Sequence, residues 1–263
     1  MLKSKFLHDL EINIMAEIPK TSAPEAEDLL DDIIWRTFSL TFVEYPEGDS
    51  LGKLLAVLSL SPLIIVIVFL TFFAAERDVH TMTFGIGTII NGILNYVLKH
   101  TIKEARPQHI TKRSETKLWE QYGMPSSHSQ FMCFVMVYLV LFVHFRVNNS
   151  GGRLTKSLWF LFSLSCLALA GIVAYGRIYL GYHTWSQVKW GSAIGAGCAI
   201  FWFLMTQRLF RPWFPWLCST RLFEFFLIRD YTDIPDVIWF DYYHAKNEAK
   251  NRIRKKSFKN KSS

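Results

Sequence analysis

The stretch LLAVLSLSPLIIVIVFLTFFAA, which covers Leu54–Ala75, contains no Asp, Glu, Lys or Arg over 22 residues. A helix rises about 1.5 Å per residue, so roughly 17–25 apolar residues cross a hydrocarbon core about 30 Å thick. Four more charge-free runs reach this length, namely Thr81–Leu98, Ser129–Phe145, Ser157–Gly176 and Trp190–Gln207. We therefore predict an all-α fold, a polytopic transmembrane helical bundle with five spans.

A sixth apolar stretch, Leu209–Ile228, is interrupted by charged residues and prolines, among them Arg211, Pro215 and Glu224. These interruptions favour an interfacial or re-entrant element, with a sixth span as the alternative. The parity of the chain depends on this choice, because an extra crossing would move the C-terminal tail to the other side of the membrane.

The composition excludes most other classes of protein. Hydrophobic residues make up 51% of the 263-residue chain and charged residues only 19%, below the roughly 25% of soluble domains. The net charge of +7 is unevenly spread, since residues 1–50 are acidic by seven charges and residues 246–263 are basic by seven. Because much of the basic excess lies in one short tail of an apolar chain, we do not expect nucleic acid as a partner.

We expect three parts along the chain. They are an acidic N-terminal arm at 1–50, partly interfacial at Ile33–Val43, a membrane-embedded domain at 51–230, and a basic C-terminal tail at 231–263. The cysteines lie in or beside apolar runs, which predicts packing roles rather than a disulfide framework or a zinc site; they are Cys133, Cys166, Cys198 and Cys218.

Three polar clusters stand at the ends of the predicted spans. The second span ends where the third begins, and the fourth span ends after one return crossing, so all three clusters meet at one membrane face. This convergence predicts a single site. Its candidate residues are Lys99 and Arg106 after the second span, Ser126, Ser127 and His128 at the start of the third, and Arg177 and His183 after the fourth.

These residue types suit the chemistry of a phosphate group. Arginine presents a fork of donors that matches phosphate oxygens, and a helix start such as Ser126–His128 favours an anion. Two histidines can supply a nucleophile and a proton donor near neutral pH. We therefore predict phosphate ester hydrolysis without a metal or another cofactor.

Each residue also has an ordinary alternative role. A Lys or Arg at a membrane boundary often anchors lipid headgroups, a boundary histidine is often satisfied locally, and Ser126 alone predicts a helix cap. Asn91 and Asn95 stand one turn apart in the second span, which favours hydrogen bonds to a neighbouring helix over contact with substrate. The ordered combination of residues, rather than any one position, carries the prediction.

That combination resembles the type 2 phosphatidic acid phosphatase superfamily, which also includes vanadium haloperoxidases. Its signature is Lys, six residues, Arg-Pro; then Pro-Ser-Gly-His; then Ser-Arg, five residues, His, three residues, Asp. Here Lys99 precedes Arg106-Pro107, Pro125-Ser126-Ser127-His128 matches the second element, and Arg177 precedes His183. The spans also carry these elements in the expected order.

The likeness is closer to the dolichyldiphosphatase family over about residues 41–255. The stretch from Tyr122 to Met132 resembles its second motif, and the stretch from Tyr182 to Val188 resembles its third. This resemblance implies hydrolysis of dolichyl diphosphate to dolichyl phosphate and inorganic phosphate in the endoplasmic reticulum membrane. That reaction recycles the lipid carrier of protein N-glycosylation.

Two positions depart from the superfamily pattern. Gly176 stands where Ser usually precedes the motif Arg, and Gln187 replaces the Asp that accepts a hydrogen bond from the nucleophilic histidine. A Gln carbonyl can still orient the ring, but being neutral it stabilises an imidazolium less than a carboxylate does. Both departures resemble the dolichyldiphosphatase family.

The resemblance implies a role for each candidate. His183 attacks the terminal phosphorus and forms a phosphohistidine, and His128 protonates the departing dolichyl phosphate and then activates water. The phosphoryl oxygens are held by the side chains of Lys99, Arg106, Arg177 and Ser126 and by the Ser127 amide. Gln187 is a candidate for orienting His183.

The orientation in the membrane follows from charge and parity. Five spans place the tail opposite the active face, and the basic tail with Arg146, Arg153 and Lys156 favours that side as cytosolic. The active site is then expected in the lumen. Lys259 and Lys261 resemble a dilysine retrieval signal, which predicts recognition by the retrieval machinery.

Other functions use the same residues. A broader phosphatase of lipid or isoprenoid phosphates shares the chemistry and differs in substrate preference. A transporter or binding protein for anionic lipids needs the cations but not two histidines beside the phosphate. A haloperoxidase is disfavoured because five spans suit a membrane lipid substrate better than a soluble halide.

Overall fold

The computed structural model describes residues 49–107, 122–147, 153–234 and 237–261. Within these ranges five helices are long and apolar enough to cross a membrane, as predicted. The first crossing comprises α3 (Ser50–Leu58) and α4 (Ser61–Glu76), and the others are α5 (Val79–Ile102), α7 (Ser127–Phe142), α8 (Arg153–Tyr179) and α9 (Trp185–Met205). The predicted interfacial segment Ile33–Val43 lies outside the described residues.

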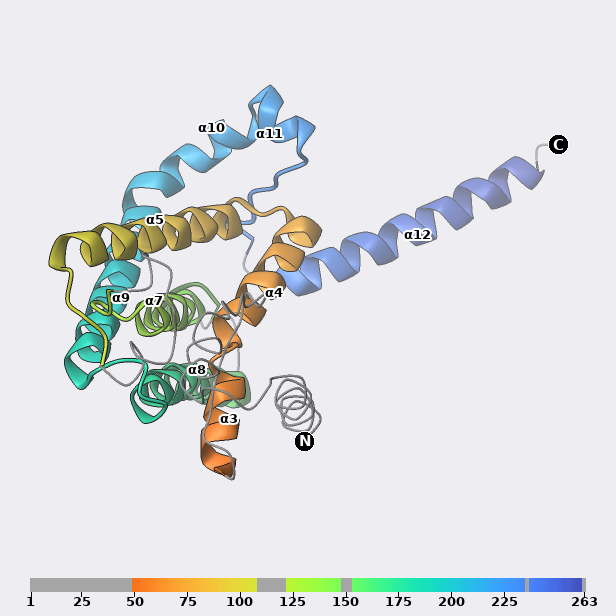
Figure 1. The fold of residues 1–263 in the computed structure, drawn as a ribbon. Coiled ribbons are helices and arrows are strands. Elements are labelled where there is room, and N and C mark those ends of the chain that lie inside the picture. The colour runs from red at the N-terminus through yellow and green to blue at the C-terminus, as the bar shows by residue number, and fades with distance from the viewer. Residues whose placement is uncertain (1–48, 108–121, 148–152, 235–236, 262–263) are drawn as a thin grey trace, which may run out of the picture. The chain divides into compact units, whose positions relative to one another are not determined.

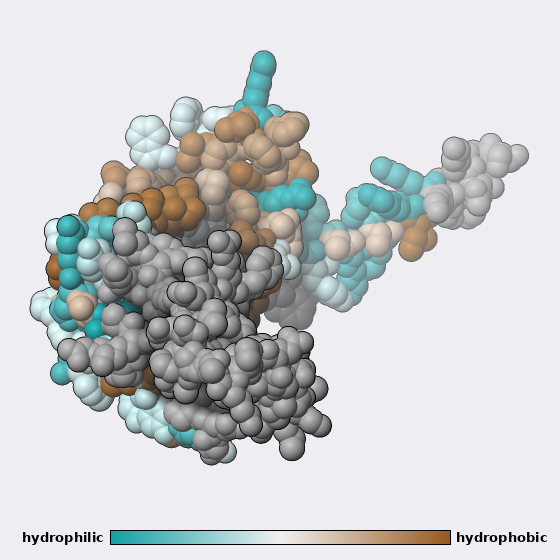
Figure 2. Space-filling model, in the orientation of Figure 1, coloured by the Kyte–Doolittle hydropathy of each residue, from teal (hydrophilic) through white to brown (hydrophobic). Residues whose placement is uncertain are grey.

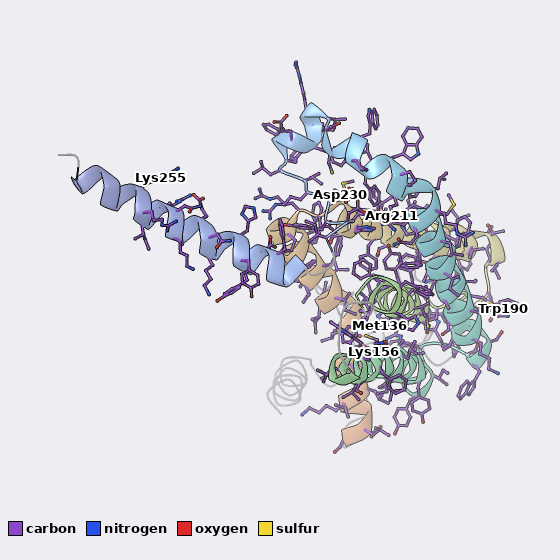
Figure 3. All side chains as sticks on the ribbon, turned by 180° about the vertical axis from the view of Figure 1, so that it is seen from behind. Met136, Lys156, Trp190, Arg211, Asp230 and Lys255 are labelled. Carbon is purple, nitrogen blue, oxygen red and sulfur yellow. The ribbon has the colours of Figure 1, made fainter. Side chains whose placement is uncertain are left out.

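Helix α7 is the centre of the bundle and packs against α5, α8 and α9 (Figure 1). Its side chains Met132, Phe134 and Tyr138 are almost completely buried and form the core with Phe203 of α9. Figure 3 shows Met136 of α7 inside the bundle and Trp190 of α9 on its outer side. The helix that begins at the predicted phosphate-binding residues is therefore held on three sides.

Helices α7 and α9 approach closely because α9 presents glycines to α7. A Cβ atom on Gly191 would lie 2.7 Å from the backbone oxygen of Ser126, and one on Gly195 would collide with the backbone of Gln130. Small residues allow such backbone contact between membrane helices. The start of α7 is thus fixed against the start of α9.

A buried polar network joins α5 to α7. Asn95 donates from Nδ2 to Oε1 of Gln130 over 2.8 Å, and Gln130 donates from Nε2 to Oδ1 of Asn91 over 2.9 Å. Asn95 also donates to the backbone oxygen of Pro125 over 3.3 Å. The prediction that the two asparagines bond a neighbouring helix is confirmed, and the network fixes α5 beside the start of α7.

The outer surface of the bundle is apolar. Helix α4 has no buried residue, and α5 exposes Ile89, Ile93 and Val97. Apolar side chains therefore cover the outer face of α5 (Figure 2). Exposure of this much apolar surface to water is unfavourable. The surface is therefore suited to lipid hydrocarbon, which the charge-free runs predict.

The stretch 209–228 does not form a spanning helix. It continues α9 through η4 (Thr206–Phe210) and η5 (Arg211–Trp213) into the short helices α10 (Phe214–Cys218) and α11 (Arg221–Phe225). The interruptions at Pro212 and Pro215 coincide with these breaks. The structure agrees with an interfacial or re-entrant element rather than a sixth span.

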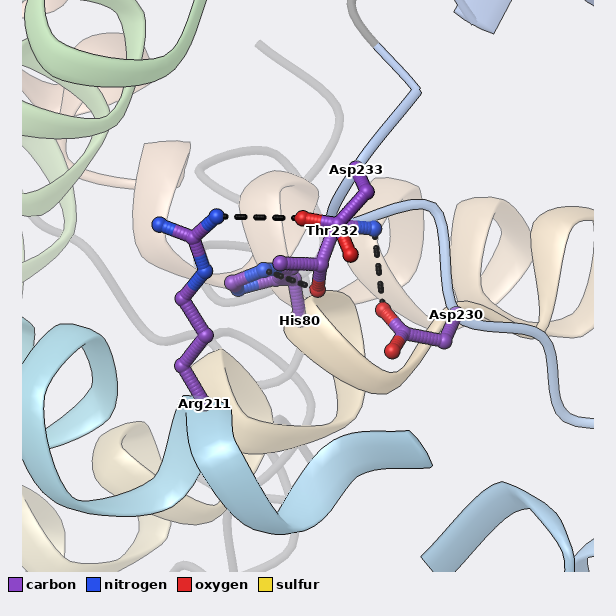
Figure 4. Close-up of polar contacts among 5 residues, drawn as sticks. All are labelled: His80, Arg211, Asp230, Thr232 and Asp233. Carbon is purple, nitrogen blue, oxygen red and sulfur yellow. Dashed lines mark hydrogen bonds and ion pairs between the residues drawn. The ribbon is translucent and has the colours of Figure 1, made fainter. Parts of the chain in front are cut away.

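The segment after α11 returns to the end of the bundle that the stretch left. Arg229 donates its amide to the backbone oxygen of Arg77 over 2.8 Å, and its own carbonyl accepts from Val79 over 3.0 Å. Figure 4 shows His80 bonded to Thr232 over 3.1 Å and Arg211 paired with Asp233 over 3.2 Å. Since α5 starts here and carries Lys99 in the last turn at its other end, the stretch 209–228 makes no net crossing.

Helix α12 (Val237–Lys261) makes up most of the described part of the tail. Its exposed polar side chains include an ion pair between Glu248 and Arg252 of 2.9 Å, and Lys255 extends from it in Figure 3. The side chains of Lys259 and Lys261 lie outside the described residues. The division of the chain into arm, membrane domain and tail stays a prediction.

Candidate active site

The three predicted cations come from two helix ends. Lys99 lies in the last turn of α5 and is 9% exposed, and Arg177 lies in the last turn of α8 and is 5% exposed. Helix α5 ends at Ile102 because Lys103 takes a left-handed conformation with φ of 53°. The chain then leaves the helix axis and carries Arg106 to the site.

Both predicted histidines lie among these cations. Arg177, Arg106 and Lys99 interact electrostatically with His128 and also with His183. His128 is half-buried in the first turn of α7, whereas His183 is 2% exposed just before α9. The structure therefore brings together the residues that the three sequence motifs predicted to meet.

The second motif forms the start of α7. Ser126 is the N-cap residue and is completely buried, and Ser127 is the first helical residue. The Ser126 amide donates to the backbone oxygen of Gln187 over 3.1 Å, and its hydroxyl accepts a hydrogen bond from Ser129 over 3.1 Å. The Ser126 amide is thus used to join two motifs, while the following amides belong to a helix start that favours anions.

The Gln187 amide is held by two backbone groups that fix its direction. Its Nε2 donates to the carbonyl of Ala105 over 2.9 Å, and its Oε1 accepts from the Thr184 amide over 3.3 Å. A carbonyl can only accept and an N–H can only donate. A flipped amide would oppose acceptor to acceptor and donor to donor, so Oε1 is the atom that faces His183.

This direction assigns the hydrogen on the His183 ring. Nδ1 of His183 lies 3.1 Å from Oε1 of Gln187, and a carbonyl oxygen requires a donor. The neutral ring therefore carries its hydrogen on Nδ1, an assignment made from the hydrogen-bond network. Nε2 is left with the lone pair that a nucleophile needs.

The surroundings also keep the ring neutral. Burial lowers the pKa of the His183 imidazole well below its usual value near 6.5, and the positive charges of Arg177 and Arg106 lower it further. The hydrogen bond to Gln187 opposes this change in part. At pH 7 the ring is neutral, which is the reactive form for attack on phosphorus.

Arg177 is fixed but retains a buried donor. Its guanidinium carbon lies 4.1 Å from the ring centroid of Tyr182, a cation–π contact, and its backbone oxygen accepts from the His183 amide over 3.1 Å. Within the described part of the chain, the Arg177 Nε has no hydrogen-bond acceptor. A buried donor without an acceptor is costly, and an anionic group would satisfy it.

An apolar pocket of about 410 Å³ adjoins the start of α7. It is lined by Ile102, Met124, Pro125, Trp190 and Ile194. Pro125 directly precedes Ser126, so the apolar pocket adjoins the predicted phosphate-binding residues.

Several residues of the site are absent from the sequence prediction. Glu104 accepts a hydrogen bond from Gln187 Nε2 over 2.9 Å, and Tyr182 covers Arg177. Glu104 is the only acidic residue between Lys99 and Pro107, and a carboxylate inside a cationic motif is a signal that could have drawn attention to it. No signal in the sequence pairs Tyr182 with Arg177 beyond their spacing.

A family model described as the PAP2 superfamily matches residues 80–223. The match covers more than half of the chain and contains all eight predicted site residues. The chain therefore belongs to the PAP2 superfamily.

Relatives narrow the family further. The chain is 46% identical to Dolichyldiphosphatase 1 of Mus musculus over 84% of this chain and 92% of the relative, and 37% identical to Dolichyldiphosphatase 1 of Dictyostelium discoideum over 84% and 94%. It is 34% identical to Lipid phosphate phosphatase gamma of Arabidopsis thaliana over 84% and 96%. The branch of the superfamily is that of the dolichyldiphosphatases, and the chain is a lipid phosphatase.

Proposed function

We propose that this protein hydrolyses dolichyl diphosphate to dolichyl phosphate and inorganic phosphate through a phosphohistidine on His183. The observation that carries the proposal is the fixed, neutral His183 ring, whose Nε2 bears a lone pair among three cations. The names of the mouse and Dictyostelium relatives support the substrate. The apolar pocket at Pro125 supports a substrate with a long hydrocarbon chain.

In the first step Nε2 of His183 attacks the terminal phosphorus. An N–P bond forms as the bond from phosphorus to the bridging oxygen breaks, and His128 donates a proton to the departing dolichyl phosphate. Lys99, Arg106 and Arg177 neutralise charge on the phosphoryl oxygens, with further donors from Ser126 and the Ser127 amide.

In the second step water attacks the phosphohistidine. The water oxygen forms a new bond to phosphorus as the N–P bond breaks, and His128 accepts one proton from that water. Inorganic phosphate then leaves, and His128 has regained the proton that it gave up in the first step. His183 returns to its neutral form with Nδ1 still donating to Gln187.

The reaction requires no divalent metal in this proposal. Hydrolysis by the purified protein is expected to continue at an unchanged rate in excess chelator, because three cationic side chains already neutralise the phosphate charge. The measurement is phosphate release with and without chelator, with a metal-dependent phosphatase as the control. Activity that returns only when a divalent cation is added would refute the scheme.

A broader lipid phosphatase is the second candidate function. The relative named Lipid phosphate phosphatase gamma favours it, since the catalytic residues would be shared. Phosphate release measured side by side on dolichyl diphosphate, dolichyl phosphate and phosphatidate decides between the two. A clear preference for dolichyl diphosphate supports the first candidate, and equal rates support the second.

We further propose that the protein recycles the lipid carrier of N-glycosylation in the endoplasmic reticulum membrane, with a luminal active site and a cytosolic tail. The basic residues of the tail support this orientation. Lys259 and Lys261 are proposed as a retrieval signal.

The orientation predicts the outcome of glycosylation mapping. An Asn-X-Thr acceptor in a spacer inserted within 108–121 is expected to be glycosylated, because that insertion follows Arg106 and precedes Ser126, two residues proposed to lie on the luminal face. The same spacer inserted within 148–152 is the matched control and is expected to remain unmodified. Electrophoretic shifts before and after glycosidase treatment measure both, and the reverse pattern would contradict the luminal site.

A further inference from the structure

A carboxylate lies directly behind the amide that orients His183. Oε1 of Glu104 accepts a hydrogen bond of 2.9 Å from Nε2 of Gln187, while Oε1 of Gln187 faces Nδ1 of His183 at 3.1 Å. Glu104 therefore does not touch the ring. It is connected to the ring through the side-chain amide of Gln187, whose direction is fixed by backbone atoms.

The position of Glu104 is itself fixed. Its backbone oxygen accepts from the Gly123 amide over 2.8 Å, and the next residue, Ala105, pairs with Tyr122 in an isolated β-bridge. The end of the first motif is thus joined to the start of the second. These bonds fix the backbone at Glu104, from which the carboxylate reaches Nε2 of Gln187.

The Gln187 amide is enclosed and has no alternative arrangement. The side chain is completely buried, and both of its polar atoms make two hydrogen bonds each. A Cβ atom on Gly123 would lie only 2.6 Å from Gln187 Oε1. The relay from Glu104 through Gln187 to His183 is therefore a rigid, saturated chain of hydrogen bonds.

We propose that Glu104 is a positioning residue that acts on His183 through Gln187. Its negative charge polarises the Gln187 amide, which strengthens the bond that Oε1 accepts from Nδ1–H. It also lies near the ring when Nε2 carries the phosphoryl group and the ring is positively charged. A neutral amide at position 187 then suffices, because the charge is supplied by the residue behind it. This inference rests on the proposed role of His183.

The substitution Glu104→Gln separates charge from shape. The new amide can present its carbonyl oxygen to Gln187 Nε2, so the hydrogen bond and the packing are retained and only the charge is removed. We expect kcat on dolichyl diphosphate to fall about 10-fold. This is the lower end of the losses seen when a residue that orients a metal-binding side chain is changed. KM should stay within about twofold, since Glu104 does not contact the substrate.

The pH profile gives a second readout. Removing a negative charge from behind the ring lowers the pKa of His183, so the acid limb of kcat/KM should move to lower pH. A purely structural role would move neither this limb nor kcat, because the shape is retained. Glu104→Ala removes both charge and bond and should reduce kcat at least as much. Glu224→Gln, which makes the same change on α11 far from the site, is the matched control.

The outcomes are distinct. A Glu104→Gln variant with kcat within about twofold of the unaltered protein, or with a loss found only in KM, overturns this inference. A His183→Asn variant that keeps full activity overturns the proposed function instead. An inactive His183→Asn variant beside a fully active Glu104→Gln variant would leave the proposed function intact and remove only the role of Glu104.

Discussion

Replacement of His183 by Asn is expected to reduce turnover by at least about 10⁴-fold, the scale on which loss of a nucleophile acts. The nitrogen of an Asn amide is not nucleophilic, because its lone pair is delocalised into the carbonyl group, although the amide can still hydrogen-bond Gln187. Lys99, Arg106 and Arg177 remain in place, so substrate should still bind. The measurement is phosphate release by the purified variant at saturating dolichyl diphosphate.

The control for this substitution is His144→Asn. His144 is exposed in η2 (Val143–Val147), which continues α7 at the end away from the site, and it received no role in the sequence prediction. This variant should retain full activity. If His183→Asn retained more than about one-tenth of normal turnover, the assignment of the nucleophile would be wrong.

Replacement of His128 by Asn is expected to reduce turnover by about 10²- to 10⁴-fold, the range of a general acid–base group. The predicted cause is loss of the proton for dolichyl phosphate in the first step and loss of the base for water in the second. Dinitrophenyl phosphate has a leaving group much less basic than dolichyl phosphate, so that group departs without a proton. With that substrate the first step should survive and the second should not.

The His128→Asn variant should therefore release about one equivalent of dinitrophenolate in a burst and then stall as phosphoenzyme. Stopped-flow absorbance at high enzyme concentration measures this burst. An equal loss of rate with both substrates and no burst would contradict the assignment of His128 as the acid and base.

The bundle could be predicted because its cause is local. A membrane span requires a continuous apolar run, and each of the five runs is read directly from the chain. The breaks in 209–228 were likewise visible at Pro212 and Pro215. That this stretch makes no net crossing was not visible, because it depends on the hydrogen bond from the Arg229 amide to the backbone oxygen of Arg77, 152 residues away.

The residues of the candidate site could be predicted from the sequence, but the hydrogen bonds that connect them could not. Lys99, Arg106, Arg177, His128 and His183 follow from residue type, span parity and family resemblance. In the sequence, Gln187 departs from the superfamily pattern, because a neutral side chain stands where a carboxylate is expected. The carboxylate of Glu104 lies behind Gln187 because two segments 83 residues apart pack together, and this packing is not visible in the sequence.

Detection of the phosphoenzyme is the most direct test of the proposed phosphohistidine mechanism. Dolichyl diphosphate labelled on its terminal phosphate is mixed with the enzyme and quenched with alkali, which preserves phosphohistidine. We expect label on Nε2 of His183, formed at least as fast as turnover and absent from the His183→Asn variant. Turnover without any labelled enzyme, or label on another residue, would contradict it.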